Sequence, residues 1–226
     1  SGEIRVSSGD GSLESGDIQM ESGVSQNQAG NIVLSVGESN TQGGGIMLAG
    51  GDSGSETGGL VLLKTGTSAA SVSGNLHLKT SEGDASSGNI VFSSGSSYSE
   101  NGVSGTIALR TGDASSGMIS GDLIFLAGGG NKGGNFIVSG GDSVTSTGGS
   151  VSMRSGKSQM GFSGSSIFRS KDSYSSGAVH ILSGNASSGG SGALNIRSEN
   201  SFLFSGDVKI ASGMGHDGSI ASSIGN

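Results

Sequence analysis

The chain contains no cysteine, no proline and no tryptophan among its 226 residues. Without cysteine, neither a disulfide framework nor a thiolate metal site can form. Aromatic residues make up only 4% of the chain, charged residues 13%, and the formal net charge is −7. A nucleic-acid-binding protein normally carries a basic stripe and stacking aromatics, so this composition argues against a nucleic acid as a partner.

Long apolar runs are missing as well. Runs such as Leu60–Leu63 are only four residues long, whereas a membrane-spanning helix needs about 20 apolar residues. We therefore expect no membrane span. The 47 glycines and abundant serines, with no sustained helical periodicity between them, argue against a helical fold. The lack of proline and the irregular spacing of the glycines exclude collagen.

The chain does contain a repeat, which first appears as Gly2–Gly9. Its pattern is Gly, any residue, apolar, any residue, apolar, any residue, Ser or Thr, Gly. Sixteen units follow one another at similar intervals, and a period of this kind indicates a repeat architecture. The units start at Gly2, Gly16, Gly30, Gly44, Gly59, Gly74, Gly88, Gly105, Gly121, Gly134, Gly149, Gly164, Gly177, Gly192, Gly206 and, in degenerate form, Gly218.

Two positions of the unit are apolar almost throughout the array. The second and fourth residues after the starting glycine are apolar in 30 of 32 cases, with Ser166 and Ser222 as the exceptions. Residues two apart lie on one face of a β-strand. Ile and Val dominate the second position, and these β-branched side chains suit a pleated surface.

These observations predict an all-β fold, a parallel β-solenoid (β-helix) of about 16 coils with about 14–15 residues per coil, in a single array over residues 1–226. At about 4.8 Å per coil, the rod would be about 75 Å long. Residues such as Val72, Val103 and Phe162 are expected to face inward from weaker return strands. Residues 218–226 are expected to form a degenerate last coil or cap, and the in-phase start of the chain predicts a longer array.

The residue between the two apolar positions is predicted to face outward. On stacked coils these residues would form a stripe: Val33, Met47, Leu62, His77, Val91, Ala108, Ile124 and Ile137. A contiguous exposed apolar patch usually marks an interaction surface. The stripe therefore predicts an interface with another copy of the chain, with a second domain, or with a cell-wall or glycan surface. The alternative is that these side chains face solvent without a partner.

The charged residues also follow the repeat. Basic residues occupy the next outward position, and many acids come just after the segment, at positions such as Asp52 and Asp142. Solubility and turn formation explain this distribution best, because Asp after Gly favours tight turns. Charge pairing between rods that lie side by side is the alternative, and exposed pairs would add little energy.

No motif predicts catalysis, a cofactor or a metal site. His77, His180 and His216 lie in different units, too far apart to share a metal ion. Gly156-Lys157-Ser158 is similar to the end of a phosphate-binding loop, but Val151 stands where the motif needs glycine. The tandem calcium-binding β-roll motif is absent from the sequence, although scattered turn acids could bind Ca²⁺ weakly. We therefore predict that the protein is not an enzyme.

Units such as Ser87–Gly95 and Ser120–Gly128 resemble the Gly/Ser-rich tandem arrays of large secreted or cell-surface proteins of diatoms and other microalgae. The resemblance covers nearly the whole chain and implies an extracellular or cell-surface location. It favours a non-enzymatic structural protein that builds a filament, sheath or adhesive surface by lateral or end-to-end self-association. The alternative is a binding module for ice, mineral or polysaccharide that uses a flat strand face.

Overall fold

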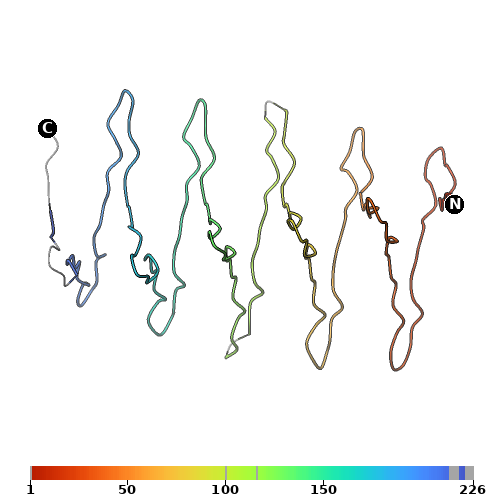
Figure 1. Ribbon diagram of the computed structural model, residues 1–226, viewed down its shortest axis with the longest axis horizontal. Coiled ribbons are helices and arrows are strands. Elements are labelled where there is room, and N and C mark those ends of the chain that lie inside the picture. Colours follow the sequence, from red (N-terminus) through yellow and green to blue (C-terminus); the bar gives the residue numbers. More distant parts are fainter. Residues whose placement is uncertain (1, 100, 116, 214–218, 222–226) are drawn as a thin grey trace. The chain divides into compact units, whose positions relative to one another are not determined.

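A computed structural model of the chain describes residues 2–99, 101–115, 117–213 and 219–221. Within these ranges there is no helix and no strand. The chain divides into two parts, which we call the N-terminal half, Ser1–Arg110, and the C-terminal half, Thr111–Asn226. Figure 1 shows that each half consists of extended runs joined by rounded loops, without helical ribbons or strand arrows.

The prediction of an all-β solenoid, or β-helix, is wrong for the described residues. A parallel solenoid needs backbone hydrogen bonds between residues one coil apart, which here means about 14–15 positions. The backbone–backbone bonds of the described residues span only three to eight positions, and Gly59 to Gly51 is one of the longest. These bonds close loops locally, and they do not stack one unit on the next.

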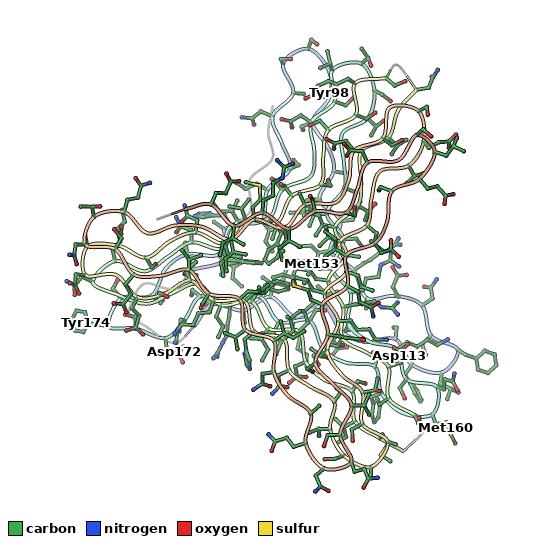
Figure 2. All side chains as sticks on the ribbon, turned by 90° about the vertical axis from the view of Figure 1, so that its right-hand side faces the viewer. Tyr98, Asp113, Met153, Met160, Asp172 and Tyr174 are labelled. Carbon is green, nitrogen blue, oxygen red and sulfur yellow. The ribbon has the colours of Figure 1, made fainter. Side chains whose placement is uncertain are left out.

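The composition of the return segments explains why the coils do not close. Val72, Val103 and Phe162 were expected to face inward, but they are 88%, 91% and 102% exposed. Glycine, serine and other small polar residues make up most of each return segment, so it has little apolar area to bury against the extended runs. In Figure 2, Met160 lies at the outer end of a loop, whereas Met153 lies on the extended run before it.

The described residues form no hydrophobic core. None of their hydrophobic side chains is buried, and the accessible surface of the chain is 23613 Å². A compact protein of 21.8 kDa would expose about 9,000 Å², and a fully unfolded chain about 32,000 Å². The single chain therefore leaves most of its apolar area in contact with water.

The order of exposure nevertheless follows the predicted alternation. From Ile18 to Val208, apolar residues at the second position are 49–67% exposed, and from Met20 to Ile210 those at the fourth position are 55–72% exposed. The large apolar residues between them are 68–90% exposed. The alternation thus correctly predicts which side chains are better shielded, although it does not produce a buried face.

The predicted last coil or cap, residues 218–226, falls mostly outside the described residues. Only residues 219–221 of it are described, and they lie in neither a helix nor a strand. His216 also lies outside the described residues. A single continuous array over the whole chain therefore stays a prediction.

Candidate assembly surface

Most extended segments end with a residue that lies against the glycine that starts the next unit, and we call this contact the neck. The starting glycines Gly177 and Gly206 have no such neighbour within 4 Å. A Cβ atom added to Gly30 would lie 3.6 Å from the Cβ atom of Ser22. The close approach recurs in both parts of the chain, at Ser8–Gly16, Ser22–Gly30, Val36–Gly44, Thr65–Gly74, Thr80–Gly88, Ser94–Gly105, Thr111–Gly121, Ala127–Gly134, Ser155–Gly164 and Ser183–Gly192. Among these necks the contact is tight at Gly44, Gly74 and Gly105 and of ordinary van der Waals length at the others.

Two necks consist of glycine on both sides. A Cβ atom on Gly50 would lie 2.5 Å from the carbonyl oxygen of Gly59, and one on Gly59 would lie 2.6 Å from the amide nitrogen of Gly51. Gly140 approaches the carbonyl oxygen of Gly149 in the same way. Real Cβ atoms do not come this close to backbone atoms, so these positions require glycine.

Backbone hydrogen bonds close five of the necks. The amide of the unit-starting glycine donates to the carbonyl oxygen of a glycine six or eight residues earlier, over 2.8–3.0 Å. These donor and acceptor pairs are Gly59–Gly51, Gly74–Gly66, Gly134–Gly128, Gly149–Gly141 and Gly164–Gly156. Each bond holds the end of one segment beside the start of the next.

A serine turn supports each of the four loops whose closing backbone bond spans eight positions. The serine two residues after the first glycine accepts, through Oγ, the backbone N–H three residues further on. The pairs are Ser53 with Glu56, Ser68 with Ser71, Ser143 with Ser146 and Ser158 with Gly161, over 2.8–2.9 Å. Serine hydroxyls commonly stabilise turns by this kind of bond to the nearby backbone.

The same pair of loops occurs once in each half of the chain. Residues 50–59 and 140–149 both begin with Gly-Gly-Asp-Ser and end with Thr-Gly-Gly, and they lie 90 positions apart. Residues 66–74 and 156–164 follow them at the same offset and share Gly-x-Ser at their start. The Gly-x-apolar pattern does not single out these loops, but the spacing of Gly-x-Ser and the closing glycine identifies them.

The residues of the predicted stripe are all exposed. Six of them lie in the N-terminal half of the chain: Val33, Met47, Leu62, His77, Val91 and Ala108. The other two, Ile124 and Ile137, lie in the C-terminal half. Each of these residues lies in the middle of its own extended segment. A continuous stripe through all of them stays a prediction.

A fourth-position residue and a second-position residue meet across one neck in the C-terminal half of the chain. The rings of Phe125 and Phe136 stack with their centroids 6.2 Å apart and an angle of 30° between their planes. Phe125 is the fourth-position residue of one segment, and Phe136 is the second-position residue of the next. Both rings remain more than half exposed. At this neck, therefore, two apolar side chains meet without being covered.

The ion pairs among the described residues are local and exposed. Arg197 pairs with Glu199 at 3.2 Å, and Lys209 pairs with Asp207 at 3.3 Å. In each pair the partners are two positions apart, on the same side of an extended segment. All four side chains are at least 73% exposed, and pairs of this kind contribute little to stability.

The described part of the chain offers no concave ligand site. It has no pocket and no group of three or more His, Asp or Glu residues close enough to hold a metal ion. None of its segments forms a helix that could cross a bilayer. Comparisons with protein-family models, with curated proteins and with solved structures found no match. The extended segments and their necks are therefore the features from which a function can be argued.

Proposed function

We propose that this chain is a non-enzymatic structural protein that assembles with copies of itself into an extracellular or cell-surface filament, sheath or adhesive layer. The observation that carries the proposal is the exposure of the repeated apolar positions. Apolar residues at the second and fourth positions keep about half or more of their surface in water, from Ile18 to Ile210. Removing such area from water is the main favourable contribution to protein association.

The amount of exposed surface favours an extended assembly over a single contact. The accessible surface of 23613 Å² exceeds that of a compact protein of this mass by about 14,000 Å². A standard protein–protein interface buries only about 1,200–2,000 Å² in total. One interface of that size would leave most of the apolar positions exposed. Repeated contacts along the whole chain are needed, as in a filament or a layer.

The even distribution of functional groups supports a structural role over catalysis. An active site normally brings a few polar groups together in a concave pocket. Here the unit varies little along the chain, and His77 and His180 are exposed in different units of the repeat. The proposed extracellular location rests on the resemblance to secreted Gly/Ser-rich arrays.

The alternative of a binding module for ice, mineral or polysaccharide is less well supported. It depended on a flat face made of neighbouring strands, and the described residues form no strand. Self-association needs no such face in the isolated chain, because the surface would form only when copies meet. We therefore favour assembly over ligand binding.

Sedimentation velocity of two triple variants tests the proposal. The first variant, called the segment variant, carries lysine at the second-position residues Ile32, Val61 and Ile90. The control carries lysine at the loop residues Val24, Val72 and Val144, which are 88–103% exposed. Both variants change the net charge from −7 by the same amount, so general repulsion is matched.

We expect the unmodified chain and the loop variant to associate at micromolar concentration. The segment variant should need at least about a tenfold higher concentration, because each buried ammonium group would lose its hydration. Equal association of the two variants would show that the second-position residues are not buried in the assembly. A chain that stays monomeric at every concentration would overturn the proposed function.

A further inference from the structure

We infer that copies of the chain join by backbone hydrogen bonding between their extended segments, while the loops stay outside the contact. This inference rests on the proposed function and adds the chemistry of the interface. The partner to which it commits is a second copy of this chain.

The extended segments have unused hydrogen-bonding groups on their backbone. Every backbone–backbone bond among the described residues belongs to a neck or a turn. The backbone N–H groups that donate to side chains also lie in loops, for example those of Glu56, Ser71 and Gly161. Between the starting glycine and the neck, as in residues 122–127, the described N–H and C=O groups bond to no other protein group.

Burying the apolar side chains without pairing these backbone groups would be unfavourable. An assembly that covers the second and fourth positions of a segment also removes much of its backbone from water. A buried N–H or C=O group left without a partner costs about 1–3 kcal/mol, and almost all buried backbone groups in proteins are paired. The covering partner therefore has to supply donors and acceptors along its length, as another extended segment does.

A second copy of the chain meets this requirement better than an unrelated surface. It presents unpaired N–H and C=O groups over the same length, with apolar side chains at the same alternate positions. Its segments also return at the same spacing along the sequence. Once one segment has paired, the next segments of the two chains are therefore brought near each other.

The necks favour this arrangement because they hold each loop closed. The bonds from Gly59 to Gly51 and from Gly149 to Gly141 fix where one segment ends and the next begins. The loops between them carry their own serine turns, at Ser53 and Ser143, and so satisfy part of their backbone locally. The groups that remain for a partner lie mainly in the segments.

Hydrogen–deuterium exchange of the full chain, measured by mass spectrometry across a concentration series, tests the inference. Above the concentration at which sedimentation shows association, amides of segments 89–94 and 122–127 should exchange at least about 100-fold more slowly than in the dilute chain. Amides of loop residues 54–57 should change little. The variant Val91→Pro removes a backbone donor and should abolish the protection of its segment, whereas the loop control Val144→Pro should not.

The outcomes separate the two proposals. Association without slower exchange in the segments would overturn backbone pairing but leave the proposed function standing. Protection that survives in Val91→Pro as fully as in Val144→Pro would also overturn backbone pairing. If no association occurs in the same samples, the proposed function fails together with the inference.

Discussion

Replacing Gly50 with alanine should open the neck of the loop that ends at Gly59. The new Cβ atom would lie 2.5 Å from the Gly59 carbonyl oxygen. Backbone carbon–oxygen contacts are rarely shorter than about 3.3 Å, so the neck must widen by about 0.8 Å. The hydrogen bond from Gly59 to Gly51 is 2.8 Å long, and the same widening stretches it to about 3.6 Å, beyond hydrogen-bonding distance.

The expected energy change is the loss of this one hydrogen bond. Such a bond contributes about 0.5–1.5 kcal/mol, and a change of about 1 kcal/mol alters the ratio of open to closed loops about fivefold. Alanine also reduces the conformational entropy of the open chain, which acts in the opposite direction by about 0.4–1 kcal/mol. This second effect has to be measured separately.

Gly51→Ala is the matched control for Gly50→Ala. A Cβ atom on Gly51 has no neighbour within 4 Å, and neither glycine has a positive φ. The control therefore carries the entropic effect without the clash. In the isotope-labelled chain, NMR should show the Gly59 amide exchanging about fivefold faster in Gly50→Ala than in Gly51→Ala. Equal rates would refute the geometry of the neck.

Two further substitutions test the loops in the same way. Ser53→Ala removes the acceptor of the Glu56 amide, which lies 2.9 Å away, and should speed exchange of that amide by the equivalent of about 1 kcal/mol; Ser55→Ala is the control, and equal exchange in both variants would argue against the serine turn. Gly117 has a φ of 83°, so Gly117→Ala should open the turn in which the Met118 amide donates to Ser115, at a cost of about 1–2 kcal/mol. Gly112→Ala, without a neighbour within 4 Å or a positive φ, should leave this turn closed; identical Met118 exchange in the two alanine variants would contradict the prediction.

The alternation in the sequence predicted relative exposure well. Ile90 at the second position is 50% exposed and its neighbour Val91 is 79% exposed, as expected for side chains on opposite faces of an extended segment. The alternation depends only on the local geometry of an extended chain. It could therefore be predicted without knowing what each segment packs against.

The pairing of the segments could not be predicted in the same way. A shared period shows that the units are alike, but it does not say which groups of one unit bond to another. A neck such as Gly51–Gly59 and a stacked coil give the same period. Val72 and Phe162 are almost fully exposed, so the return segments do not supply the apolar surface that would face the extended segments across a solenoid core. The exposure of Val33 and Ile124 follows from the local alternation, whereas their place in one stripe stays a prediction.

Small-angle scattering over a dilution series tests most directly whether the apolar surface is buried only when copies associate. A compact chain of 226 residues has a radius of gyration of about 17 Å, and an unfolded one of about 52 Å. We expect the dilute chain to lie well above the compact value and the scattering mass to rise with concentration. A monomer of the compact size at every concentration, or an expanded chain whose mass never rises, would contradict this claim.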